Sequence, residues 1–247
     1  QHRRLYARFR GSSVAAEPSL AQGDLALLED LRKNFEPLGA NCELGFLMGR
    51  LGIQRSSLFR WLFTPLASLE QVLAEGLDRF LSEPVAVTDP VMAADMVVDQ
   101  RTGLFFHAGE LRQQLEQAGE DPAALAQVRA GEACRDQRGK YRYLVEKFLA
   151  SVPVASTLHV FSDFHRELDE AAMLRIHSRL RDLGKPLGST LLFVQPADGS
   201  TEVNSVRCLG DGLQLAAIRR FAPGEHADQI DLEAWMSVLS RSRQLSS

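Results

Sequence analysis

The chain of 247 residues contains little cysteine and no long run of apolar residues. Its three cysteines, Cys42, Cys134 and Cys208, are odd in number and widely spaced, which excludes a disulfide framework and a zinc site of the CxxC type. A reducing compartment is therefore the simpler prediction, and we expect a cytoplasmic location. No apolar run approaches the roughly 20 residues of a membrane-spanning helix, so we expect no membrane span.

The sequence also lacks a strong excess of charge and the common cofactor motifs. Its formal net charge is −4, which provides no field for holding a polyanion, so we expect no nucleic-acid partner. It has no GxGxxG, Walker A, HExxH or GxSxG pattern, so we predict neither a nucleotide cofactor nor a metal. The 45% of hydrophobic and 24% of charged residues that it does have are typical of a globular protein.

The chain divides into a short polar start and one long patterned region. Residues 1–23 mix basic, small and polar types, and we interpret them as a tail or linker. Residues 24–247 are long enough to bury the core of a single α/β domain. Because the first residue is not Met, we interpret the chain as a trimmed or partial polypeptide.

Apolar periodicity in residues 24–247 indicates both strands and helices. It predicts helices at 24–35, 44–51, 66–80 and 166–183 and after Asp231, and strands within 84–107, at 157–161 and 189–195 and in a hairpin over 202–219. The strand–helix–strand unit between 157 and 195 predicts parallel pairing through a right-handed crossover. We therefore expect a mixed β-sheet with flanking helices.

The best candidate for chemistry is Cys42, which we place in the first turn of the helix whose apolar stripe covers 44–51. Asn41 is placed to cap this helix, and the face that carries Cys42 also carries two glycines, which leave space beside the thiol. The positive end of the helix dipole would stabilise a thiolate, and first-turn N–H groups or the Asn41 amide would receive an oxyanion. The alternative is that Cys42 is a small buried residue near a helix start.

A cysteine nucleophile needs a base, and His107 is the best placed of the six histidines because it ends an apolar strand. Asp163, just after the strand at 157–161, is the first choice for orienting the imidazole, and Glu110 is the second. The alternative for His107 is a structural histidine with satisfied hydrogen bonds.

Several segments resemble a bacterial family described as papain-like cysteine peptidases. The family shows an LG-x-NCE-x-G segment, an aromatic segment, TPL and a phenylalanine-rich strand that ends in histidine. The corresponding segments here are residues 38–46, 58–61, 64–66 and 104–107, and the resemblance continues through 142–148, 191–195 and 218–223. It implies Cys42 as nucleophile and His107 as base, and a fold that is papain-like. Members resemble modules associated with glycosyltransferases of bacterial surface-polysaccharide pathways.

Two positions depart from the family pattern. Many members carry aspartate where this chain has Arg60, and relatives often place an arginine where this chain has Ser162 and Asp163. The strand–helix–strand unit also suits an open three-layer α/β sandwich at least as well as a papain fold.

Two functions follow from these observations. The first is a cysteine-dependent acyl-transfer enzyme, a hydrolase or transferase, that acts on a peptide, ester or thioester. The second is a non-catalytic module that binds a glycan or a partner such as a glycosyltransferase domain. Trp61 and its neighbour Arg60 are the candidate substrate-binding residues, because an aromatic face offers apolar contact to a sugar ring.

Overall fold

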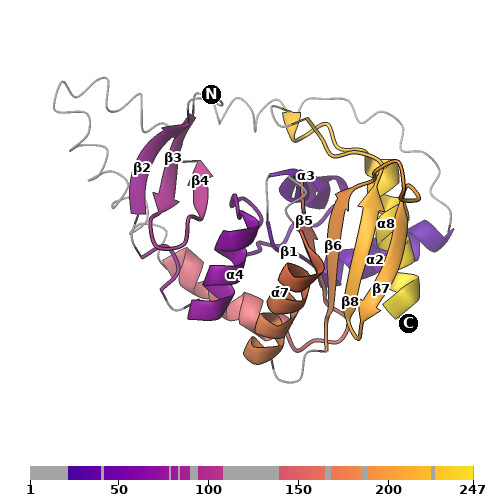
Figure 1. Cartoon of the computed structure of the whole chain (residues 1–247), viewed down its shortest axis with the longest axis horizontal. Coiled ribbons are helices and arrows are strands. Elements are labelled where there is room, and N and C mark those ends of the chain that lie inside the picture. The colour runs from indigo at the N-terminus through magenta and orange to yellow at the C-terminus, as the bar shows by residue number, and fades with distance from the viewer. Residues whose placement is uncertain are drawn as a thin grey trace.

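The computed structural model describes residues 22–39, 42–77, 79–82, 84–89, 94–107, 139–164, 168–184, 188–223 and 226–246. These residues form two sheets and the helices around them (Figure 1). The larger sheet has five strands in the order β1-β5-β6-β8-β7, and the smaller has three strands in the order β2-β3-β4. The prediction of a mixed α/β fold with flanking helices is confirmed.

Four strands of the larger sheet are parallel: β1 (Phe35–Pro37), β5 (Leu158–Ser162), β6 (Thr190–Pro196) and β8 (Leu213–Ile218). The fifth strand, β7 (Ser205–Gly210), is antiparallel and forms the predicted hairpin with β8. Helix α7 (Glu170–Leu183) connects β5 to β6, so the predicted parallel strand–helix–strand unit is confirmed. Its N-cap, Asp169, accepts a hydrogen bond from the Ala172 N–H.

Apolar residues on both faces of the larger sheet explain why helices cover both. Along β6, Leu191 and Phe193 belong to one buried cluster and Leu192 and Val194 to the other, because successive side chains point to opposite faces. One face packs against α2 (Gln22–Asn34), α3 (Glu43–Arg50) and α8 (Leu232–Ser246). The other packs against α4 (Leu66–Glu75), the helix over 139–151 and α7. In the part of the chain that the structure describes, no helix is long and apolar enough to span a bilayer.

The smaller sheet contains β2 (Pro84–Asp89), β3 (Ala94–Asp99) and β4 (Phe105–His107), all antiparallel. A turn joins β3 to β4, with Gly103 at φ +72° and the Thr102 hydroxyl donating to the Asp99 carboxylate over 2.6 Å. Phe63 joins this sheet to the rest of the molecule by pairing with Phe105, and their rings stack at 4.8 Å.

The four parallel strands end at one edge of the larger sheet, which we call the carboxyl edge and which lies at the top in Figure 1. The segments that leave β1, β5 and β8 there carry Gly39 and Cys42, Asp163, and Arg219 to Ala222. Open parallel sheets bind ligands outside this edge. The fold therefore places Cys42 and Asp163 at the edge where a site is expected.

Candidate functional site

Cys42 lies on the turn that leads from β1 into α3. The start of this turn is held to β5, because the Leu38 N–H donates to the Val160 carbonyl over 2.7 Å. The Ser162 hydroxyl donates to the Gly39 carbonyl over 3.3 Å. Gly39 has φ +98°, and a Cβ there would overlap Thr64, so only glycine fits this position without strain. The position of Cys42 is therefore determined by β1, by Gly39 and by the start of α3.

The apolar stripe predicted for α3 is confirmed, because Leu44, Leu47, Met48 and Leu51 are buried, whereas Gly49 is exposed. Cys42 is the N-cap of this helix rather than a first-turn residue, and its side chain makes no capping hydrogen bond. Burial raises the pKa of the Cys42 thiol to about 11, because the thiolate is desolvated there. The resting thiol is therefore protonated at neutral pH.

Glu43, the next residue, is a buried acid whose importance the spacing did not indicate. Its carboxylate accepts hydrogen bonds from the Trp235 indole N–H over 2.9 Å and from the Ala222 N–H over 3.1 Å. Burial is the main cause that raises its pKa to about 7, and the two hydrogen bonds oppose that rise. Glu43 therefore ties the start of α3 to α8 and to the segment after β8.

Asp163, predicted to orient the base, follows β5 at the carboxyl edge and is buried. Its N–H donates to the Val194 carbonyl over 2.6 Å, which continues the sheet by one residue. Its carboxylate accepts a hydrogen bond from the Leu168 N–H over 2.9 Å. Asp163 thus holds the segment that leads to α7.

Arg60 and Trp61, the candidate substrate-binding residues, lie between α3 and α4 and pack against α3. The Arg60 guanidinium donates to the carbonyls of Ile53, Arg55 and Gly45 over 3.3, 3.1 and 3.5 Å. The Trp61 ring packs so closely on Gly45 that a Cβ there would approach it to 2.7 Å. Trp61 also meets Phe46 edge-on at 5.4 Å and stays 38% exposed, so an aromatic surface borders α3.

The base predicted from the sequence, His107, ends β4 in the smaller sheet, where its backbone pairs with Met96. The His107 side chain, and all of Asn41 and Glu110, lie outside the described residues, so their catalytic roles stay predictions. The capping role predicted for Asn41 is wrong, because Cys42 is the N-cap of α3. His159 lies in the middle of β5 and is fully buried; burial lowers its pKa to about 3. It cannot exchange protons with a substrate at the carboxyl edge.

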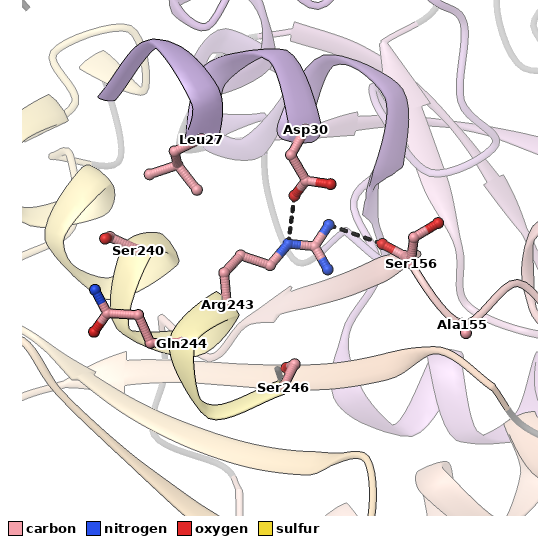
Figure 2. A pocket seen from close by; sticks show the side chains of 8 residues that line it. All are labelled: Leu27, Asp30, Ala155, Ser156, Ser240, Arg243, Gln244 and Ser246. Carbon is pink, nitrogen blue, oxygen red and sulfur yellow. Dashed lines mark hydrogen bonds and ion pairs between the residues drawn. The ribbon is translucent and has the colours of Figure 1, made fainter. Parts of the chain in front are cut away.

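A pocket of about 380 Å³ lies at the opposite edge of the sheet, between α2, α8 and the turn before β5 (Figure 2). Arg243 crosses it, pairing with the Asp30 carboxylate at 2.7 Å and donating to the Ser156 carbonyl over 2.8 Å. This pocket is unrelated to Cys42. Within the described ranges, no group of three or more histidine, cysteine, aspartate or glutamate residues could hold a metal ion.

Comparisons of the chain with protein families, curated proteins and solved structures found no match. The geometry of the carboxyl edge is therefore the basis for the functional proposal.

Proposed function

We propose that this protein is a cysteine-dependent acyl-transfer enzyme in which Cys42 is the nucleophile. The observation that carries the proposal is the position of Cys42 at the junction of β1, a glycine turn and the start of α3. Many hydrolases hold their nucleophile on such a strand–turn–helix junction at the carboxyl edge, where the N–H of the following residue faces the substrate oxygen.

The raised pKa of Cys42 favours one form of this chemistry. A thiol with a pKa of about 11 does not attack as a preformed thiolate, so a base has to take its proton during the attack. The sulfur then bonds to the carbonyl carbon and the carbonyl electron pair moves to oxygen. When that pair returns to re-form the carbonyl, the bond to the amine, alcohol or thiol breaks, the leaving group takes the proton from the base, and a thioester remains on Cys42. Water or an acceptor alcohol next attacks the thioester, gives its proton to the same base, and releases the Cys42 sulfur.

The remaining roles come from the sequence. Asn41 and the first-turn N–H groups of α3 would hold the oxyanion, and the resemblance assigns the base to His107. Peptide, ester and thioester donors all fit the chemistry, and surface-polysaccharide assembly is the context that the resemblance implies. The proposal rests on the position of Cys42 between β1 and α3. It does not depend on the papain-like fold that the resemblance also implies.

The test is to expose the purified chain to a panel of activated esters, thioesters and peptide amides and to search for a thioester on Cys42 by peptide mass spectrometry. We expect at least one class of donor to acylate Cys42, with loss of turnover in Cys42→Ala. Cys208 is an exposed free thiol on β7 and serves as the internal control. Turnover that survives in Cys42→Ala would contradict the proposal.

The exposed face of Trp61 supports a second candidate, a module that binds a glycan. Trp61 stays 38% exposed beside Phe46, and an aromatic face of this kind can stack on a sugar ring. Quenching of tryptophan fluorescence by surface oligosaccharides that is lost in Trp61→Ala and kept in Cys42→Ser would favour this candidate. The other tryptophan, Trp235, is buried and gives a constant background.

A further inference from the structure

We propose that Glu43 is a positioning residue for the Cys42 reaction, and that its buried carboxylate sets where Cys42 and the first turn of α3 lie at the carboxyl edge. This inference rests on the proposed function and adds one residue to the same site. It follows from the covalent link between Glu43 and Cys42 and from the hydrogen bonds that the Glu43 carboxylate makes with two distant elements.

Glu43 is the first residue of α3 and directly follows Cys42, the N-cap. Across their peptide bond the two Cα atoms are about 3.8 Å apart, so a displacement of Glu43 also displaces Cys42. The Phe46 N–H donates to the Cys42 carbonyl over 3.1 Å, which closes the first turn of α3 on Cys42. Cys42, Glu43 and this first turn therefore move as one unit.

The two oxygens of the Glu43 carboxylate bind different parts of the fold. The Oε1 atom accepts a hydrogen bond from the Trp235 indole N–H of α8 over 2.9 Å. The Oε2 atom accepts one from the Ala222 N–H, in the segment that leaves β8, over 3.1 Å. Because Glu43 is buried, its carboxylate needs such partners to offset the loss of water. The start of α3 is thus joined to α8 and to the segment after β8 by one side chain.

The two donors are held in place by contacts of their own. Trp235 is fully buried, and its backbone N–H donates to the Asp231 carbonyl over 3.0 Å. Phe221, next to Ala222, packs on the Trp235 ring with ring centres 6.0 Å apart. It also packs on Phe164, which follows β5, at 6.5 Å. The carboxylate therefore binds a packed group of residues at the ends of β5 and β8.

These hydrogen bonds fix the start of α3 more narrowly than apolar packing does. The apolar stripe of α3 belongs to the buried cluster on its face of the sheet, and such contacts have no preferred direction. The Cys42 side chain adds no capping hydrogen bond. A fully paired buried polar group instead specifies one arrangement. Placement matters for acyl transfer, because a shift of about 1 Å between reacting groups slows a reaction about 100-fold.

The kinetic test compares two reactions of the Cys42 thiol, both read by peptide mass spectrometry. Acetylation by p-nitrophenyl acetate needs Cys42 aligned with the oxyanion donors and the base, whereas alkylation by iodoacetamide at alkaline pH needs only an accessible thiolate. The ratio of the acetylation rate to the alkylation rate therefore reports alignment. We expect this ratio to fall about 10-fold in Glu43→Gln, which keeps one acceptor oxygen, and about 100-fold in Glu43→Ala, which keeps none.

Two further variants separate positioning from a loss of stability. Trp235→Phe removes one donor and leaves Glu43 in place, and we expect the ratio to fall about 10-fold. Glu36→Gln is the matched control, because Glu36 is a buried acid of β1 whose partners are Arg55 and Ser57, and we expect no change in the ratio. A ratio that stays at the parent value in both Glu43→Gln and Trp235→Phe overturns the proposal, and so does an equal fall in Glu36→Gln.

Amide hydrogen exchange, followed by NMR, tests the anchoring of α3 without any need for activity. We expect the Phe46 N–H to exchange faster in Glu43→Gln and in Trp235→Phe, relative to the amides of β6, and at the parent rate in Glu36→Gln. Exchange at the parent rate in the first two variants overturns the proposal. If the parent chain is not acylated on Cys42 by this ester or by any donor of the panel, the proposed function fails, and the exchange rates still show whether Glu43 holds the start of α3.

Discussion

Replacing His159 is expected to change how the stability of the protein depends on pH. His159 lies in β5 between β1 and β6, with the Phe148 ring edge-on at 5.7 Å and the Ser151 hydroxyl 3.4 Å from its Nε2. Burial, and secondarily the charge of Arg55, lower its pKa from 6.5 to about 3. The imidazole therefore stays neutral in the folded protein under conditions that protonate it in the unfolded chain.

The sign of the effect follows from the protons bound in each state. Between pH 6.5 and about 3 the unfolded chain carries a proton on this residue and the folded protein does not, so stability falls as the pH falls. Each pH unit in this window corresponds to about 1.4 kcal/mol, so the loss reaches about 3 kcal/mol near pH 4 and at most about 5 kcal/mol.

The assay is urea unfolding of the parent chain and His159→Leu at a series of pH values. The difference in unfolding free energy between the two isolates His159 from Glu43, whose raised pKa has the opposite effect on stability over part of this range. Ser151→Ala is the matched control, because it removes the neighbouring hydroxyl and keeps the titrating imidazole. A difference that stays constant from pH ~7 to pH ~4 would refute the reasoning.

Three further substitutions test the contacts around Cys42. The parent chain is expected to lose stability as the pH rises from 4.5 to about 7, because the folded protein prefers the protonated form of Glu43, and Glu43→Gln is expected to abolish this pH dependence. Urea unfolding at pH ~5 and ~8 measures it, and a pH dependence that is the same in both proteins contradicts it. Arg60→Ala is expected to lower the unfolding free energy by about 2–4 kcal/mol, because three backbone carbonyls lose their hydrogen-bond donor. Arg60→Lys is the control that keeps the charge, and an unchanged unfolding free energy in Arg60→Ala would show that these hydrogen bonds contribute little. Gly39→Ala is expected to lower the melting temperature, because φ is +98° and the new Cβ meets Thr64, and adding Thr64→Ala is expected to recover part of the loss; full tolerance of Gly39→Ala would mean that the turn adopts another conformation.

Sequence patterns predicted the regular elements well because those elements depend on neighbouring residues. The buried stripe of α3 follows the helical period. The helix predicted after Asp231 is α8, and the Asp231 carboxylate caps it by accepting a hydrogen bond from the Ala234 N–H. The parallel pairing of β5 and β6 followed from the helix between them.

The contacts that define the candidate site depend instead on residues far apart in the sequence. Glu43 meets the Trp235 indole 192 positions later, and no local period indicates such a partner. The Thr64 side chain lies against Gly39, 25 positions earlier in the chain, and Pro65 is the N-cap of α4. Arg60 finds its acceptors in backbone carbonyls that only the folded loop brings together. Local patterns also place Cys42 near a helix start without revealing the burial that raises its pKa.

The central claim is that Cys42 is a protonated nucleophile that depends on a base, and the reactivity of its thiol tests this most directly. The measurement compares the rates at which Cys42 and the exposed Cys208 react with iodoacetamide and with p-nitrophenyl acetate as the pH is raised. We predict that Cys42 alkylates more slowly than Cys208 at neutral pH, because its thiolate forms only towards pH ~11, and yet accepts the acetyl group faster. If Cys42 is slower than Cys208 towards both reagents at every pH, Cys42 is a buried structural thiol and the account is wrong.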